Sequence, residues 1–362
     1  MSGTFEQARD FFLQGLAHYQ AGEYEAADRQ FSASLALVPG RTSTLTNLGA
    51  TRLKRGDPAG ALELLDQALA QEPGNAEACG HRATALAELG RLDEALAAVE
   101  KALELDPGVG QAWSLRGSLL RDLGRPQEAA PCFERAIAHG ADAELNRYFL
   151  AGVTAGPAPA APPRHYVQQL FDGYAGDFDR HLVEVLQYRA PQRLVQGLQG
   201  RQFASALDLG CGTGLCGPLL RPLARRLQGV DLSANMVRQA QAGGAYDSVL
   251  QADLAEHLAV TPERHDLLVA ADVFIYVGAL ERVFSGAARV LQAGGVFCFC
   301  VEAAGEDQEF VLRPSLRYAH SQRYIRMLAE QHGFAAETWA RHPVREDQGQ
   351  PIAGLFAWLV KR

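Results

Sequence analysis

Three alternate glycines preceded by an aspartate form the most chemically suggestive segment of the chain. In Ala206-Leu-Asp-Leu-Gly-Cys-Gly-Thr-Gly-Leu215, Asp208 stands two residues before Gly210, Gly212 and Gly214. Glycines permit positive φ and let a ligand lie against bare backbone. The spacing differs from the G-x-G-x-x-G of dinucleotide-binding turns. A carboxylate at position 208 would repel a pyrophosphate, so the segment favours a ligand that carries an ammonium group.

The elements that position this turn alternate between strand and helix patterns. Strands are expected at 203–209, 227–231, 247–252, 266–271 and 295–302, with helices at about 215–226, 233–242 and 279–291. A helix at 321–331 and two strands at 335–340 and 351–360 follow, and the last two could close the edge as an antiparallel pair. This order predicts a seven-stranded, mostly parallel sheet with helices on both faces.

The segment 208–214 resembles the first motif of the class I S-adenosylmethionine-dependent methyltransferases. Later landmarks keep the order of that family: Asp231 in Gly229-Val-Asp-Leu-Ser233, Asp253 after the third strand, and the fourth-strand pattern 266–272. The resemblance implies a Rossmann-like methyltransferase domain. It also implies S-adenosyl-L-methionine as cofactor and S-adenosyl-L-homocysteine as product.

Carried over residue by residue, the resemblance assigns Asp231 to the ribose hydroxyls and Asp253 to the adenine amino group. For either acid taken alone, the alternative is a helix N-cap or a turn residue. The cofactor-binding residues expected in this part of the chain are Asp208, Gly210, Cys211, Gly212, Gly214, Asp231, Leu232, Ser233, Met236, Asp253 and Leu254.

A helical segment ahead of the sheet carries aromatic residues at helical spacing. Phe171, Tyr174 and Phe178 fall at i, i+3 and i+7. Together with Tyr-Arg-Ala-Pro at 188–191, this segment resembles bacterial methyltransferases that carry tetratricopeptide repeats. It is also similar to the Williams–Beuren-region group and, more distantly, to quinone-biosynthesis enzymes. In such enzymes the segment folds over the cofactor, where its aromatic side chains could shield a sulfonium. Plain packing against the sheet is the alternative.

Two residues are candidates for the group that handles the methyl acceptor. Asp272 ends the fourth predicted strand, and His320 precedes the helix at 321–331. Tyr276 and Glu302 are weaker candidates. Methyl transfer from a sulfonium is an in-line displacement, so a base is needed only if the acceptor must lose a proton. No Asn-Pro-Pro-Tyr-type segment follows the fourth strand, which disfavours amide or nucleobase nitrogen as acceptor.

The first part of the chain is a repeat. Gly22, Gly56, Gly90 and Gly124 lie 34 residues apart, as do alanines at 27, 61, 95 and 129. This period and these residue types resemble the tetratricopeptide repeat, in which stacked pairs of helices share one core. Four repeats are expected at about 8–41, 42–75, 76–109 and 110–143, followed by a capping helix at 141–152.

Composition and linker residues divide the chain into three parts. Four prolines between residues 155 and 163 predict an extended spacer. The expected domains are therefore the repeats at 1–152, a linker at 153–163 and the methyltransferase domain at 164–362.

A net charge of −8 without a basic stripe makes nucleic acid an unfavoured partner. The absence of a long apolar stretch or signal peptide favours the cytoplasm. The six cysteines form no CxxC pair, which predicts reduced thiols and no metal site.

These features favour a methyltransferase whose repeats recruit or position a substrate, or another protein or peptide partner. One alternative is a small-molecule methyltransferase, for natural products or quinone-like acceptors, whose repeats serve assembly, including homo-oligomerisation. Another alternative is a non-enzymatic scaffold that retains the cofactor fold as a relic.

Overall fold

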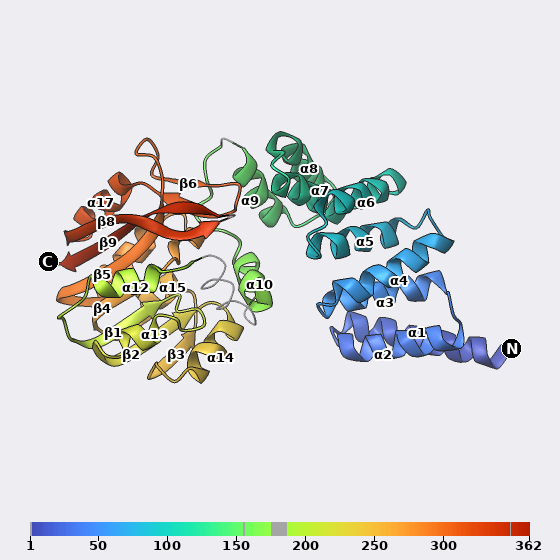
Figure 1. The fold of residues 1–362 in the computed structure, drawn as a ribbon, viewed down its shortest axis with the longest axis horizontal. Helices are drawn as coiled ribbons and strands as arrows, with labels where there is room; N and C mark the ends of the chain where they lie inside the picture. Colours follow the sequence, from blue (N-terminus) through green and yellow to red (C-terminus); the bar gives the residue numbers. More distant parts are fainter. Residues whose placement is uncertain (1, 155, 175–186, 348) are drawn as a thin grey trace. The chain divides into compact units, whose positions relative to one another are not determined.

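The computed structural model describes residues 2–154, 156–174, 187–347 and 349–362, and the chain forms two compact units (Figure 1). The units are Met1–Thr154 and Ala155–Arg362. Phe178 lies outside the described residues.

The first unit is a solenoid of paired helices, as predicted (Figure 1). Four helical hairpins are followed by one further helix, which covers the stretch expected to cap the array. The helices are α1 (Ser2–Gln20), α2 (Tyr24–Leu37), α3 (Thr42–Lys54), α4 (Pro58–Gln71), α5 (Ala76–Glu88), α6 (Leu92–Leu105), α7 (Gly110–Asp122), α8 (Pro126–Ala138) and α9 (Ala143–Val153).

Small residues account for the close pairing of these helices. The turn glycine of each hairpin adopts positive φ, from 72° at Gly124 to 76° at Gly22. Within the helices, a Cβ atom built on Gly117 would lie 2.6 Å from the Phe133 ring, so only glycine leaves room for this contact. The repeated alanines, such as Ala95, are fully buried between neighbouring helices. The 34-residue period therefore repeats the positions at which small residues let two helices pack closely.

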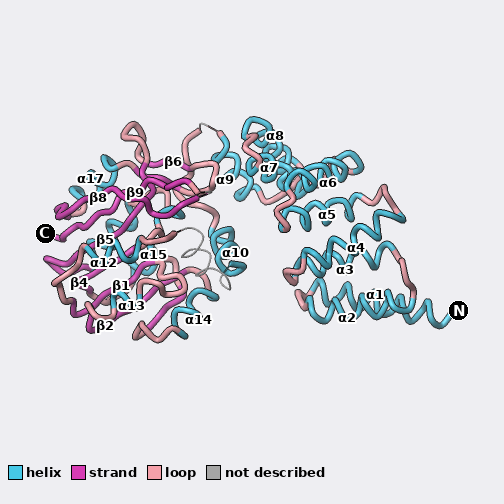
Figure 2. The backbone as a smooth tube through the Cα atoms, in the orientation of Figure 1, coloured by secondary structure: helices cyan, strands magenta, loops and turns pink. Residues whose placement is uncertain are grey.

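The second unit is built on one mixed sheet (Figure 2). Its strands are β1 (Phe203–Leu209), β2 (Ala224–Asp231), β3 (Ser248–Gln251), β4 (His265–Ala270), β5 (Leu291–Ala303), β6 (Phe310–Leu312), β7 (Tyr318–His320), β8 (Phe334–Asp347) and β9 (Gln350–Lys361). Strands β3, β2, β1, β4 and β5 are neighbours in that order and pair in parallel. Strand β9 pairs antiparallel with both β5 and β8.

The expected number of seven strands is wrong, because the described residues form nine. The two additional strands are the short antiparallel pair β6 and β7. Strand β5 pairs with β9 as far as Glu302, and β7 pairs with its last residues, Glu302 and Ala303. Because Glu302 pairs with both strands, β7 lies on the edge of β5 opposite to β9, where β4 pairs only as far as Phe299 and leaves a short free edge for the β6–β7 hairpin.

The described helices of this unit are short, and α13 and α15 differ from expectation. They are α10 (Arg164–Tyr174), α12 (Ala190–Gln196), α13 (Gly217–Leu220), α14 (Ala234–Ala242), α15 (Leu254–Val260), η2 (Phe274–Tyr276), α16 (Glu281–Val290) and α17 (Gln322–Gln331). The helix predicted at 215–226 is limited to α13. Pro222 has no N–H to continue a helix, and the chain enters β2 at Ala224. Helix α15 was not predicted.

The apolar core lies on both faces of the sheet. Phe297 and Phe299 pack with side chains of α16 and α17 on one face. Cys298 and Cys300 lie on the opposite face, with side chains of α12 and α13. All six cysteines are buried free thiols. The predicted reading of the segment around Cys298 as a buried strand is confirmed.

Two glycine-to-alanine substitutions in the repeat unit should have opposite effects. Gly117→Ala should lower the free energy of unfolding by about 1–3 kcal/mol, because its methyl group would overlap the Phe133 ring. Gly80→Ala should raise this free energy by about 0.5–1 kcal/mol, because position 80 is helical with open space around it. Urea titrations followed by circular dichroism would measure both, and equal effects would contradict the close-packing account.

Candidate functional site

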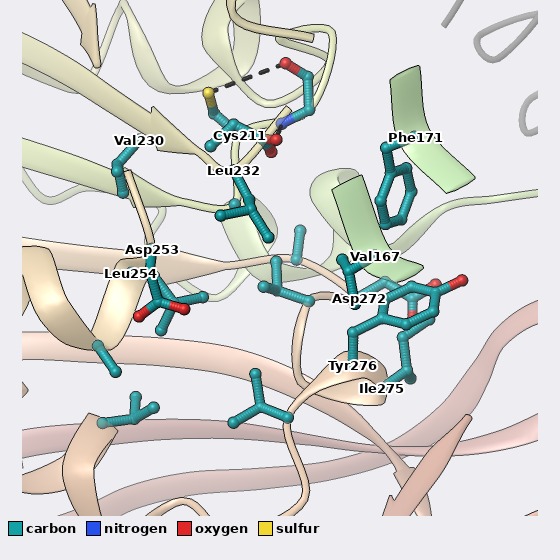
Figure 3. Close-up of a pocket in the computed structure, with 18 of the residues that line it drawn as sticks. Val167, Phe171, Cys211, Val230, Leu232, Asp253, Leu254, Asp272, Ile275 and Tyr276 are labelled. Carbon is teal, nitrogen blue, oxygen red and sulfur yellow. Dashed lines mark hydrogen bonds between the residues drawn. The ribbon is translucent and has the colours of Figure 1, made fainter. Parts of the chain in front are cut away.

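A cavity of about 620 Å³ opens where the parallel strands of the second unit end (Figure 3). Its lining includes the residues that follow β1, β2 and β4, together with side chains of α10. This is the edge at which open α/β sheets bind their ligands. The cavity also has the size of a typical small-molecule site.

The glycine turn after β1 forms one wall of the cavity. Gly210, Gly212 and Gly214 have φ values of 64°, 55° and 98°. Gly210 and Gly212 line the cavity, together with Cys211 between them. A Cβ on Gly214 would instead lie 3.1 Å from Tyr246, so Gly214 serves packing and does not line the cavity.

Asp231 at the end of β2 is tied to this turn. One carboxylate oxygen accepts the Gly212 N–H at 2.9 Å, and the other accepts the Ser233 N–H at 2.9 Å. Burial raises the pKa of the Asp231 carboxyl, and the backbone hydrogen bonds act in the opposite direction. Because each carboxylate oxygen can accept more than one hydrogen bond, Asp231 can also bind a pair of ligand hydroxyls in the cavity.

Asp253 lines the cavity and is at the same time a helix N-cap. Its Oδ1 accepts the Glu256 N–H at 2.9 Å at the start of α15. Leu232 and Leu254 supply apolar surface beside it (Figure 3). The capping role and a ligand-binding role are therefore compatible for this residue.

Asp208 does not line the cavity, contrary to the role expected for it. Its side chain is buried, and its Oδ2 accepts a hydrogen bond from the Tyr246 hydroxyl at 2.7 Å. Burial raises the pKa of Asp208 to about 7, and the Tyr246 hydrogen bond opposes this shift. Tyr246 was not predicted as a partner of Asp208, because nothing in the local pattern ahead of β3 marks it.

Two further expected cofactor residues, Ser233 and Met236, lie behind the cavity wall. The Ser233 hydroxyl accepts the Met236 N–H at 3.2 Å as the N-cap of α14. It also donates to Asp172 of α10 at 2.5 Å. Met236 is fully buried. Ser233 therefore acts as a cap and as the docking point of α10.

Helix α10 contributes apolar side chains to the cavity. Val167 and Phe171 line it (Figure 3). The Phe171 ring packs edge-on against Tyr276, with 5.1 Å between ring centroids and 85° between planes. Tyr174 is the last residue of this helix. Phe171 is thus a cavity residue as well as a packing residue.

Asp272 lines the cavity beyond the end of β4 and is held by a buried arginine. Its Oδ2 accepts from Arg345 at 2.5 Å, and Arg345 also pairs with Glu302. Burial raises the pKa of the Asp272 carboxyl, and Arg345 opposes the shift. Glu302 is itself buried and also pairs with Arg313 at 2.6 Å, so it supports the cavity wall without lining it.

Arg345, which was not predicted as a site residue, reaches this site from a bulge in β8. The β8–β9 register shifts between Pro343 and Glu346, so Arg345 lies outside the regular ladder. Gly354 of β9 leaves room for the bulge, since a Cβ there would overlap the Val344 side chain. Arg345 therefore meets a carboxylate 73 residues away in sequence, which no local pattern reveals.

His320 does not line the cavity and is not carried forward as a catalytic candidate. The imidazole is fully buried, and its Nε2 lies 3.0 Å from the Val277 carbonyl and 2.9 Å from that of Gly278. Two carbonyl acceptors require Nε2 to carry a hydrogen. Burial lowers the pKa of His320 to about 4, so a neutral ring holds the segment after η2 in place.

Within the described ranges no cluster of side chains suited to hold a metal ion is found. None of the described helices is both long and apolar enough to span a membrane.

Comparison with known sequence families matches both units. Residues 12–76, 52–119 and 110–138 match families described as tetratricopeptide repeat. Residues 207–299 match a family described as methyltransferase domain.

Curated relatives match part of the chain. A malonyl-[acyl-carrier protein] O-methyltransferase of Geobacter sulfurreducens is 32% identical over 162 residues, which are 43% of this chain and 59% of the relative. Methyltransferase-like protein 27 of Homo sapiens is 32% identical over 151 residues, 39% of this chain and 59% of that protein. The chain thus spans 59% of the length of each of these two relatives.

Two solved structures are similar to part of the chain. Magnesium protoporphyrin IX methyltransferase of Synechocystis PCC 6803, with bound SAH, is 17% identical, with a TM-score of 0.44, over 55% of this chain and 99% of that chain. A MamA protein is 23% identical, with a TM-score of 0.34, over 37% of this chain and 73% of that chain.

The raised pKa of Asp208 predicts a pH dependence of stability. Between about pH 4, the ordinary pKa of an aspartate, and about pH 7, the folded chain holds a proton on Asp208 that the unfolded chain has lost. The contribution of Asp208 to stability should therefore be full below about pH 4 and be lost as the pH rises to about 7. Asp208→Asn should lack this decline.

The measurement is the free energy of unfolding of both proteins between pH 4 and 8. Tyr246→Phe serves as the comparison, because loss of the hydrogen bond to the carboxylate should extend the decline to higher pH. Parallel pH profiles of the chain and of Asp208→Asn would contradict the assignment.

Proposed function

We propose that this chain, in which tetratricopeptide repeats precede a methyltransferase domain, is an S-adenosylmethionine-dependent methyltransferase whose repeats recruit a protein partner or a protein-borne substrate. The observation that carries the enzymatic part is Asp231, which lines the cavity while it holds the glycine turn through the Gly212 N–H. The segment that matches the methyltransferase family contains both residues.

The residues that line the cavity fit this cofactor in chemistry and position. Asp231 offers carboxylate oxygens to the ribose hydroxyls. Asp253 and Leu254 offer an acceptor and an apolar contact to the adenine, while Phe171 offers an aromatic face to a sulfonium. S-Adenosylmethionine would supply a methyl group already activated on sulfur.

The task left to the protein is alignment and exclusion of water. An in-line displacement requires the acceptor atom, the methyl carbon and the sulfur to be collinear, which a rigid pocket provides. Val167, Phe171 and Ile275 give the cavity apolar walls from α10 and from the segment after β4. Helix α10 is fixed in place by Asp172, which accepts the Ser233 hydroxyl at the start of α14.

The role of the repeats is supported by their architecture. Stacked helical pairs expose extended surfaces on which peptides and proteins bind. The relative from Geobacter sulfurreducens is named for a group attached to a carrier protein, which favours an acceptor carried on a protein here as well. A small-molecule acceptor, with repeats that serve assembly, is the competing proposal.

Asp231→Ala should weaken S-adenosylmethionine binding by about 1–3 kcal/mol, because it removes the acceptor for the ribose hydroxyls and leaves two N–H groups unpaired. Isothermal titration calorimetry measures the affinity. Asp307→Ala, at an exposed acid that does not line the cavity, is the control and should bind as tightly as the unaltered chain. Unchanged affinity of Asp231→Ala would remove this residue from the cofactor site.

Deletion of residues 1–152 should separate recruitment from catalysis. The truncated chain should bind S-adenosylmethionine within about twofold of the full chain, because the cavity residues all lie in the second unit. With labelled cofactor and a cell extract, methyl transfer into the protein fraction should be lost. Labelling of small molecules that survives the deletion would favour the competing proposal.

A further inference from the structure

We propose that residues 159–162, which lead from the repeats into helix α10, form a strap over the cavity: docking of this strap and binding of a ligand in the cavity stabilise each other. From the sequence, this stretch is expected only to be part of an extended spacer. The inference rests on the proposed function in one respect, since S-adenosylhomocysteine is the ligand used to test it.

The strap supplies part of the cavity wall. Ala160, Ala161 and Pro162 line the cavity. The Pro163 carbonyl accepts the Val167 N–H at 3.3 Å, so the strap continues directly into α10, and Val167 lines the same cavity (Figure 3). Ala160 and Ala161 are exposed. A ligand in the cavity can therefore cover apolar surface of the strap.

Backbone contacts attach the strap to the residues that follow η2. The Ala160 carbonyl accepts the Ala279 N–H at 2.8 Å. Beside this bond, a Cβ built on Gly278 would lie 2.8 Å from the carbonyl oxygens of both Pro159 and Ala160. Only glycine at position 278 permits this approach, so the attachment depends on Gly278 and Ala279.

The surface that receives the strap is itself held by β7. The His320 Nε2 donates to the carbonyls of Val277 and Gly278, at 3.0 and 2.9 Å. A Cβ on Gly278 would also lie 2.6 Å from the Tyr318 ring, so this ring packs directly on the glycine. His320 does not line the cavity, but it fixes the segment on which the strap docks.

The strength of the attachment allows it to open locally. Arg164 pairs with Glu256 at 3.2 Å, but these side chains are 53% and 56% exposed, and exposed ion pairs contribute little. The four prolines between residues 155 and 163 fix φ, which reduces the backbone entropy lost on docking. One backbone hydrogen bond and one close contact on a preordered segment can open without unfolding of the sheet.

Ligand binding and docking of the strap are therefore linked equilibria. A ligand that contacts the docked strap binds this state more tightly and increases its population. Conversely, the apparent ligand affinity falls in proportion to the docked fraction. Because the strap is also part of the covalent connection to the repeats, the occupant of the cavity determines how firmly this connection is held.

Hydrogen exchange of the Ala279 amide reports docking directly, because this N–H is bonded to the Ala160 carbonyl. With S-adenosylhomocysteine at ten times its dissociation constant, protection of this amide should rise about tenfold. The Gly243 amide, at the end of α14 and away from the cavity lining, should change less than about twofold. Unchanged protection of Ala279 while calorimetry shows bound ligand would overturn the proposal.

A pair of proline substitutions tests docking without any ligand. Pro159→Ala keeps the carbonyl oxygen but frees φ within the strap, so protection of the Ala279 amide should fall about two- to fivefold. Pro157→Ala makes the same change ahead of the strap and should leave this protection unchanged. Equal effects of the two substitutions, or no effect of either, would refute docking of the strap. If the unaltered chain bound no S-adenosylhomocysteine, the proposed function would fail, whereas this pair would still decide the docking.

Gly278→Ala links docking to affinity. Its methyl group would displace the strap carbonyls, and S-adenosylhomocysteine should bind about tenfold more weakly, as expected for a docked fraction of about one tenth. Gly243→Ala is the matched control: its Cβ would make an ordinary 3.5 Å contact with the Ala240 carbonyl, and its affinity should equal that of the unaltered chain. A folded Gly278→Ala chain with unchanged affinity would contradict the linkage. If this variant did not fold, the Ala279 exchange and the proline pair would decide.

Discussion

The hydrogen bond between the Gly212 N–H and the Asp231 carboxylate is the interaction on which the candidate site depends. The parallel register of β1 and β2 pairs Leu209 with Val230, which brings the residues that follow each strand to the same edge. Gly212 adopts positive φ there, so its N–H can meet the carboxylate. One acid thereby fixes the shape of the turn and still presents oxygens to the cavity. The register of β1 and β2, the positive φ of Gly212 and the position of Asp231 in the cavity therefore depend on one another.

A second set of contacts ties the far end of the chain to the same cavity. Arg345 leaves the β8 ladder at a bulge and pairs with Asp272 and Glu302, which belong to the ends of β4 and β5. Breaking such a buried pair by removing one partner leaves the other charge uncompensated. The last two strands therefore do more than close the sheet edge: through Arg345 they fix the orientation of the Asp272 side chain in the cavity wall.

Much of the fold was predictable because it depends on local signals. The repeat period gave the helical pairs, and the alternation of apolar runs located β1, β4 and β9 to within a few residues, whereas β8 extends seven residues beyond the predicted 335–340. The wrong helix at 215–226 followed from apolar spacing that outweighed Pro222. The β6–β7 hairpin could not be expected, because it pairs with an edge that exists only when β5 extends beyond the end of β4. Contacts such as Tyr246 with Asp208 and Asp172 with Ser233 join residues distant in sequence.

Asp208 and Asp272 show that a sequence motif can place a carboxylate near the site but cannot specify its hydrogen-bond partner. Asp208 is the second-last residue of β1 and Asp272 comes two residues after β4, and burial raises the pKa of both carboxyls. A phenol hydroxyl occupies the Oδ2 of Asp208, whereas an arginine occupies one oxygen of Asp272 and leaves the other facing no described partner. Residue type and strand position fix where a carboxylate stands. The side chain that reaches it from elsewhere decides which of its oxygens is paired and with what charge.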